Sequence, residues 1–236
     1  MTDSITRNEY WLLELVSELR YPVSGITSVS AEALNRPVIH LSVDDASRVL
    51  HALATRSLIQ FKESDSRSMH DDSRTVRLDL PQITDQLKLD PQCPIQVFYG
   101  LTAEGGKIWE TAYRADWNRY LSTNEAPLND NWSQSEVEIV TTSRHLTDQL
   151  SQAYRFSLAD HGQQIHGEGK WDIVSPWRAT YWKSLSEGHR VRYIAHQIEG
   201  PVVIEPTTID GELAKKITAW RLEHANWYQS PISYES

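Results

Sequence analysis

The chain has 236 residues, of which 39% are hydrophobic, so it can bury the core of one large domain or of two small ones. Its formal net charge is −9, and the two halves divided at Glu125 are both acidic, which excludes the overall basic charge expected of a nucleic-acid binder. The single cysteine excludes a disulfide framework, and the lack of a signal peptide or of a run of about 20 apolar residues predicts a soluble cytoplasmic protein.

The first part of the chain contains two strong helix signals. Thr6-Arg-Asn-Glu9 fits a capping box, in which the Thr and Glu side chains each bind a free amide at a helix start. The apolar stripe that follows ends before Pro22, which disfavours helix in the residues ahead of it. Ser42-Val-Asp-Asp45 gives a similar cap to a second apolar stripe over residues 43–53. A short helix is expected between the two, over residues 31–35.

Short strands and one long polar segment come next. Residues 59–61 and 76–80 have the composition of strands. The polar segment 62–74 between them is predicted to be a mobile loop, because it has too few apolar side chains to bury. Residues 95–99 alternate between apolar and other side chains, which predicts a further strand.

An aromatic helix is predicted directly after that strand. Thr102 can cap its first turn. The aromatic side chains that recur at helical spacing are Trp109, Tyr113, Trp117 and Tyr120. We expect the first three to pack against apolar residues of the first helix, namely Leu12, Leu15 and Leu19.

This order of elements resembles a winged helix-turn-helix domain of the PadR-type and MarR-type bacterial regulators. Leu50-x-x-Leu53 with Ser57-Leu-Ile59 is similar to the end of a recognition helix that runs into the wing. Tyr99-x-Leu-Thr-x-x-Gly105 is similar to the strand-to-helix junction of these proteins. The resemblance covers residues 10–121. The segment 62–94 departs from the pattern, because a plain wing needs a far shorter connection.

The second half is predicted to be a separate domain. Residues 122–135 have the composition of a linker between a winged-helix-like domain, 1–121, and a second domain, 136–236. The second domain is expected to hold a mainly antiparallel sheet, with a hairpin turn at Gly188 and a last helix over residues 210–227. The fold class is therefore α+β. This half resembles no family that we recognise.

The helix over residues 43–53 is the one that would enter a DNA groove in a winged-helix protein. The candidate DNA contacts are Ser47, Arg48, His51 and Arg56. Arg48 suits a base edge and Arg56 a phosphate. Asp44 and Asp45 lie at the end of the helix that such proteins push toward bases, where phosphates would repel them. Stabilisation of the helix dipole explains the two acids equally well.

A cationic and aromatic surface is predicted on the C-terminal hairpin, with residues 178–183 paired to residues 190–198. The candidate ligand or partner residues are Arg178, Trp182, Lys183, Arg190 and Arg192. Such a surface suits an anionic or planar ligand, through guanidinium contacts and stacking. A solvated sheet face whose charges are balanced by nearby glutamates is the alternative interpretation.

The sequence contains no motif that indicates an enzyme, a cofactor or a metal site. Residues 160–168 include two histidines and two carboxylates, but their spacing has no metal-binding signature behind it. We therefore expect a non-enzymatic interaction or regulatory protein, with an unknown protein or an anionic ligand as its partner. The alternative is a DNA-binding transcriptional regulator with a C-terminal sensing or dimerisation domain. A homodimer would suit that alternative, because such regulators read paired half-sites.

Overall fold

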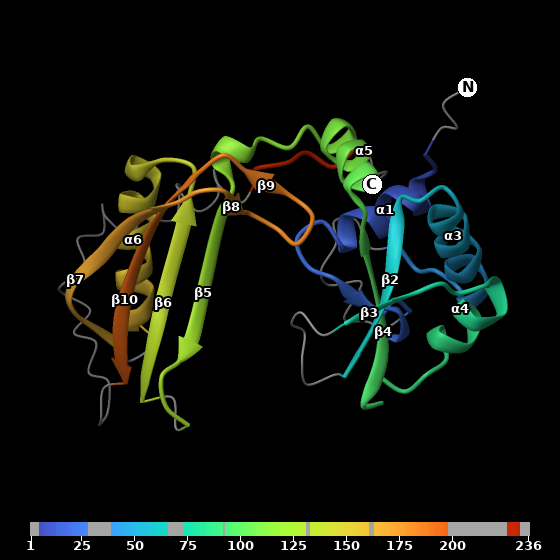
Figure 1. Cartoon of the computed structure of the whole chain (residues 1–236), viewed down its shortest axis with the longest axis horizontal. Helices are drawn as coiled ribbons and strands as arrows, with labels where there is room; N and C mark the ends of the chain where they lie inside the picture. The colour runs from blue at the N-terminus through green and yellow to red at the C-terminus, as the bar shows by residue number, and fades with distance from the viewer. Residues whose placement is uncertain are drawn as a thin grey trace. The chain divides into compact units, whose positions relative to one another are not determined.

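The structure is a computed structural model in which the described residues are 5–27, 39–65, 73–91, 93–130, 133–160, 163–197 and 226–231. For residues 65, 156–160, 164 and 166 only the backbone is described. The fold is α+β, and the paired strands in these ranges are antiparallel (Figure 1). The helix predicted over residues 31–35 lies outside the described residues, as do residues 210–225 of the helix predicted over residues 210–227. The described residues 226 and 227 are in a turn and a bend.

The chain divides into two compact units. Unit 1 comprises Met1–Arg114, Thr180–Lys183 and Gln229–Ser236. Unit 2 comprises Ala115–Ala179 and Ser184–Tyr228. A short segment from the second half of the sequence is thus part of the first unit, which differs from the predicted division of the chain at residues 122–135.

Unit 1 combines helices with a four-stranded sheet. In chain order its elements are α1 (Arg7–Leu15), β1 (Tyr21–Pro22), the short 3-10 helix η1 (Val23–Gly25), α3 (Val43–Thr55), β2 (Ile59–Asp65), β3 (Arg74–Val76), α4 (Leu80–Leu87), β4 (Ile95–Leu101) and α5 (Ala103–Tyr113). The strand order in the sheet is β1-β4-β2-β3. β2 continues four residues into the segment that was predicted to be a loop, because its backbone pairs with β4 as far as Asp65.

Three of these helices begin at the predicted caps. The Glu9 N–H donates to the Thr6 hydroxyl at 3.3 Å, and the Thr6 N–H donates to the Glu9 carboxylate at 2.7 Å, so the capping box is confirmed. Ser42 and Thr102 cap α3 and α5 through their hydroxyls. α5 ends at Tyr113, earlier than predicted, because Arg114 adopts a left-handed conformation with a φ of 50°.

The sheet of unit 1 has its helical core on one face. Because side chains alternate along a strand, Phe61 and Tyr99 point to one face and their neighbours Lys62 and Phe98 point to the other. Phe61 and Tyr99 are buried, and the Tyr99 hydroxyl donates to the Leu12 carbonyl of α1 at 3.1 Å. The core therefore lies toward α1, while Lys62 and Phe98 belong to the opposite face.

The first two aromatic residues of the predicted stripe are buried, and α5 contacts α1. Trp109 and Tyr113 are fully buried, and the Tyr113 hydroxyl donates to the Tyr10 carbonyl of α1 at 3.0 Å. Trp117 does not lie on this helix, because α5 has already ended. Leu19, one of the three expected partners on the first helix, is 68% exposed, so the prediction is wrong for Trp117 and Leu19.

The described residues of unit 2 form a four-stranded sheet with helix α6 against it, and a second sheet of two short strands. Its elements are the 3-10 helix η2 (Trp117–Arg119), β5 (Leu121–Pro127), β6 (Gln134–Thr141), α6 (Arg144–Asp160), β7 (Gln163–Val174), β8 (Trp177–Arg178), β9 (Ser184–Leu185) and β10 (Gly188–Gln197). The main sheet has the order β5-β6-β10-β7 (Figure 1). α6 packs on one face of it, around a core of Val137, Ile139, Leu150, Val191, Tyr193 and Ala195.

The predicted linker over residues 122–135 is largely β structure. β5 pairs with β6 from Leu121 to Pro127, at the edge of the main sheet. An edge strand is held by backbone hydrogen bonds to one neighbour and needs no continuous apolar face, so a polar sequence can form one. Composition alone therefore failed to distinguish this strand from a linker.

Candidate functional site

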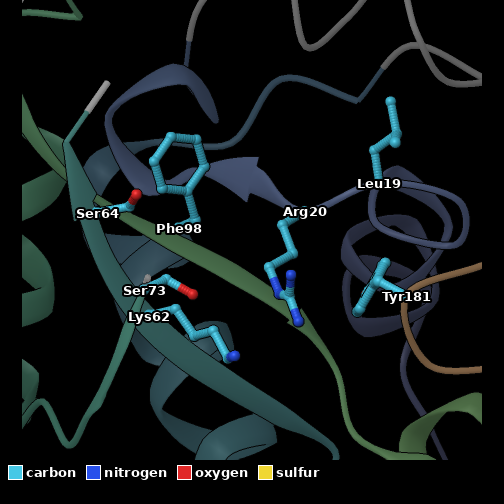
Figure 2. Close-up of a pocket in the computed structure, with 7 residues that line it drawn as sticks. All are labelled: Leu19, Arg20, Lys62, Ser64, Ser73, Phe98 and Tyr181. Carbon is cyan, nitrogen blue, oxygen red and sulfur yellow. The ribbon is translucent and has the colours of Figure 1, made fainter. Parts of the chain in front are cut away.

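Unit 1 contains a pocket on the face of its sheet opposite the helical core, which we call the sheet pocket. The volume of this cavity is about 320 Å³, and its lining residues are Leu19, Arg20, Lys62, Ser64, Ser73, Phe98 and Tyr181 (Figure 2). β2 and β4 supply Lys62, Ser64 and Phe98, while Leu19 and Arg20 come from the connection between α1 and β1. Segments far apart in the sequence thus meet at one cavity.

Tyr181 is held in this pocket by two backbone groups. Its hydroxyl donates to the Val16 carbonyl at 2.7 Å and accepts a hydrogen bond from the Leu101 N–H. β1 pairs with β4 only at Tyr99 and Phe98, so Leu101 lies beyond the end of that pairing. The Tyr181 hydroxyl therefore takes the place of a strand carbonyl. Burial raises the pKa of Tyr181 above its ordinary value, so the hydroxyl is neutral at physiological pH.

Gly100 makes room for this arrangement. A Cβ atom at this position would lie 2.9 Å from the Tyr181 hydroxyl oxygen and 2.9 Å from Cγ of Arg20. Both distances are shorter than ordinary contacts, so a side chain here would displace one or both residues. The shape of the pocket therefore depends on a glycine near the end of β4.

Two cationic side chains, Arg20 and Lys62, line the sheet pocket. The Arg20 guanidinium carbon lies 4.6 Å from the centroid of the Tyr181 ring, which is a cation–π contact that orients the guanidinium. Figure 2 shows that the ends of the Arg20 and Lys62 side chains reach toward the same side of the cavity. None of the described residues that line it is Asp or Glu, although the chain as a whole carries −9.

The two residues after Tyr181 anchor the same segment to unit 1. The Trp182 indole N–H donates to the Ser17 carbonyl at 2.7 Å, and its ring packs edge-on against Trp109 with centroids 6.2 Å apart. The Lys183 ammonium forms an ion pair with Glu110 of α5. Segment Thr180–Lys183 is thereby held by hydrogen bonds, an aromatic contact and an ion pair.

Two of the four candidate DNA contacts are engaged within unit 1. Ser47 is buried and accepts a hydrogen bond from the Thr84 hydroxyl of α4 at 2.9 Å. Arg56 forms an ion pair with Glu9 of α1 at 2.7 Å. These side chains therefore stabilise the packing of three helices.

The other two candidate contacts lie nearer the surface. The Arg48 side chain is 68% exposed, and its guanidinium lies 2.6 Å from the Asp45 carboxylate. Hydrogen bonding from Ser42, followed by the charge of Arg48, holds the pKa of Asp45 below its usual range. His51 is half-buried and lines a second cavity of about 470 Å³ beside the β2–β3 hairpin.

The predicted C-terminal hairpin is wrong. β10 pairs with β6 on one side and with β7 on the other, so residues 178–183 have no place beside it. Arg178 instead lies in β8, which pairs with β9. Trp182 and Lys183 belong to unit 1, as described above. Gly188, which was expected to form the turn, is the first residue of β10.

Arg190 and Arg192 lie on the charged face of the main sheet in unit 2. The Arg190 guanidinium contacts Asp172 at 2.6 Å and Glu138 at 3.2 Å, and that of Arg192 contacts Asp172 at 3.4 Å. The hydrogen bond from Arg190 holds the pKa of Asp172 below its usual range. These contacts correspond to the alternative interpretation, in which acidic neighbours balance the charges of the sheet face.

Sequence reasoning missed the residues that give the sheet pocket its charge. A signal for Lys62 was present, because it follows the apolar Phe61 in a strand and alternation places it on the other face. Arg20 carried no such signal, since its position depends on contact with Tyr181. That contact joins residues from opposite ends of the chain.

The described residues include no group of three or more His, Cys, Asp or Glu side chains that could hold a metal ion. Among the same residues, no helix has both the length and the apolar character needed to cross a membrane. Comparisons of the chain with protein-family models, with curated proteins and with solved structures gave no match. The chemistry of the sheet pocket is therefore the starting point for function.

Proposed function

We propose that the chain is a non-enzymatic interaction or regulatory protein, with unit 1 as a winged-helix scaffold and the sheet pocket as its binding surface. The element order supports the scaffold, because α1 and α3 precede the β2–β3 hairpin and β4 runs into α5. Leu50 and Leu53 of α3 are buried. The Thr102 N–H donates to the Leu58 carbonyl at 3.1 Å, which links the two segments that resemble PadR-type and MarR-type regulators.

The observation that favours an interaction role over DNA binding is the engagement of α3 by other helices. α4 packs against α3, and the hydrogen bond between Thr84 and Ser47 lies in this contact. Arg56 is turned toward Glu9, whose side chain is only 7% exposed. A helix that reads a DNA groove has to present such side chains outward. These contacts support a packing role for both residues.

The second candidate is a DNA-binding transcriptional regulator. It is favoured by Arg48, whose side chain is 68% exposed on α3. An exposed arginine suits a guanine edge or a phosphate. The carboxylate of Asp45 beside it offsets its charge and would repel phosphates.

Titration of mixed-sequence duplex DNA at low salt, followed by fluorescence anisotropy, tests the proposal. We expect no saturable binding, because phosphate contacts dominate DNA affinity and α3 offers one cation beside an anion. Arg48→Ala probes α3, and Lys107→Ala is the matched control, since it removes an exposed charge paired at i,i+3 on α5. Saturable binding that Arg48→Ala abolishes and Lys107→Ala preserves would overturn the proposal in favour of the regulator.

A further inference from the structure

We propose that the outer edge of β7 in unit 2 is a homodimer interface, at which β7 pairs antiparallel with β7 of a second copy of this chain. A two-fold axis passes between the two Trp171 residues, so that Lys170 of each copy lies opposite Asp172 of the other. This inference goes beyond the proposed function, because it concerns unit 2 and holds whether or not the sheet pocket of unit 1 is a binding surface.

β7 is the longer of the two edge strands of the main sheet. The strand order β5-β6-β10-β7 leaves it with β10 as its neighbour on the inner side, and no described residue pairs with its outer side. The edge of a sheet presents backbone N–H and C=O groups that can pair with a further strand. β7 has 12 residues and β5 has 7, so β7 offers more of these groups.

The C-terminal part of β7 has the regular geometry that strand pairing needs. The pairing of β7 with β10 shifts its register between Arg192 and Ile194, and Gly167 adopts a φ of 79°. A bulge of this kind bends an edge strand and interrupts the regular spacing of its free backbone groups. Residues 170–174 lie beyond the bulge and pair with β10 in one continuous register. They include no proline, so each of them keeps its backbone N–H.

The charges of this regular part select one register for the pair. A two-fold axis perpendicular to the sheet keeps each face of the sheet on the same side, so residues that point to one face lie opposite each other. An axis at Lys170 would place two lysines opposite each other, and an axis at Asp172 would place two aspartates there. Like charges in opposite positions destabilise a strand pair. An axis at Trp171 instead places Lys170 opposite Asp172 of the other copy at both ends of the pair.

Lys170 gains a compensating charge in this register. Its side chain is exposed, it lies directly across from Arg192 of β10, and it forms no ion pair with a described residue. Asp172 contacts Arg190 and Arg192, and its side chain is still 38% exposed, so a further cation can reach it. Opposite charges in opposite positions stabilise strand pairing. The Asp172 carboxylate of the other copy would therefore offset the repulsion between Lys170 and Arg192.

An apolar contact adds to the charge pairing. Ile173 is 59% exposed, and it lies on the same face of the sheet as Trp171, which packs partly buried against the core of unit 2. In the proposed register Ile173 lies diagonally across from Trp171 of the other copy, within reach of an aromatic ring. The other edge strand, β5, lacks this complementarity, because Glu125 is its one charged residue and Pro127 ends it.

Sedimentation velocity of the full chain over a range of concentrations tests the inference. We expect a monomer–dimer equilibrium with a Kd on the order of 10–100 μM, because a short strand pair buries less surface than a standard interface. Lys170→Glu and Asp172→Lys each place like charges opposite each other, and each should weaken the dimer about tenfold or more. An equimolar mixture of the two variants should dimerise as the unchanged protein does, because the substituted residues then lie opposite each other and the unchanged Lys170 and Asp172 still pair.

Two exposed charges provide matched controls. Glu168→Lys makes the same charge change as Asp172→Lys on the same strand, and Lys107→Glu reverses a cation that is 71% exposed on α5. Neither should weaken the dimer. If Asp172→Lys fails to fold, Lys170→Glu still decides, because it leaves the contacts of Asp172 with the arginines in place.

Hydrogen exchange then locates the interface. The amides of residues 170–174 should be more protected at concentrations above the Kd than below it. A protein that stays monomeric up to about 1 mM would overturn the inference. A dimer that Lys170→Glu weakens no more than Lys107→Glu would overturn it as well. Restoration of the Lys170→Glu dimer by Glu168→Lys, and not by Asp172→Lys, would overturn the axis at Trp171.

Discussion

Replacement of Tyr181 by Phe tests how the segment from the second half of the chain stabilises unit 1. The change removes one hydroxyl and keeps the ring under Arg20. That hydroxyl accepts from the Leu101 N–H and donates to the Val16 carbonyl at 2.7 Å. Leu101 and Val16 are both fully buried, so water does not replace the missing partner. We expect the free energy of unfolding of unit 1 to fall.

The magnitude follows from the two groups that are left without their partner. A buried N–H without an acceptor costs about 1–3 kcal/mol, and the loss of the second hydrogen bond costs about 1 kcal/mol. The void left by one oxygen atom is small by comparison. We therefore expect a loss of about 2–3 kcal/mol. A loss of about 2 kcal/mol corresponds to a roughly 30-fold change in the unfolding equilibrium constant.

Amide hydrogen exchange at Leu101 and urea denaturation measure this effect. In Tyr181→Phe the protection factor of the Leu101 amide should fall about 30-fold, together with a lower urea midpoint. Tyr10→Phe is the matched control, because its ring also packs in unit 1 and its hydroxyl has no hydrogen bond to a described residue. Unchanged protection at Leu101, or equal losses in the two variants, would refute the role of the Tyr181 hydroxyl as the cap of the strand.

Three further measurements test other contacts. Gly106→Ala places a Cβ atom 2.2 Å from the Trp182 ring, so urea denaturation should show a free energy of unfolding lower by about 1–3 kcal/mol. In an unobstructed helix the same change would raise that free energy by up to about 1 kcal/mol, and such a rise would contradict this reasoning. In Arg190→Gln the pKa of Asp172 should rise toward its usual value in a carbon-13 carboxyl titration. As the pH falls and Asp172 becomes protonated, unit 2 of this variant should lose less stability than unit 2 of the unchanged protein. An unchanged titration would contradict the ion pair. Burial raises the pKa of Tyr99 well above 10, so its contribution to the stability of unit 1 should be complete below about pH 10 and fall as the pH rises above it. Absorbance at alkaline pH should then show a tyrosine that ionises only on unfolding. Ionisation of all ten tyrosines in the folded protein would contradict the burial of Tyr99.

The parts of the fold that could be predicted are those specified by neighbouring residues. Thr6, Ser42 and Thr102 were recognised as helix caps because each hydroxyl binds an amide three residues ahead. The end of α5 was missed because a non-glycine residue, Arg114, supplies the left-handed turn. Local sequence predicts glycine at such a position, so the aromatic pattern was extended past Tyr113 into residues that belong to unit 2.

The candidate site was harder to predict because pairing between strands is not encoded locally. The hairpin at Gly188 was a plausible local arrangement, yet β10 buries Val191 and Tyr193 only when it lies between β6 and β7. The burial of these side chains beneath α6 stabilises the fold more than a short hairpin would, because the stabilisation grows with the apolar surface that is removed from water. Arg190 and Arg192 of the predicted surface consequently contact acidic residues of β6 and β7.

The sequence by itself determined where α1, α3 and α5 begin, which residues of β4 share a face, and the acidic balance of the chain. Each of these depends on groups a few residues apart or on composition. The tertiary structure alone decided that the Tyr181 hydroxyl accepts a hydrogen bond from the Leu101 N–H of β4, which lies 80 residues earlier in the chain. A short β1 leaves the Leu101 N–H without a strand partner, and Gly100 leaves room for a ring beside it. The sheet pocket exists because those two local features are satisfied by a distant residue.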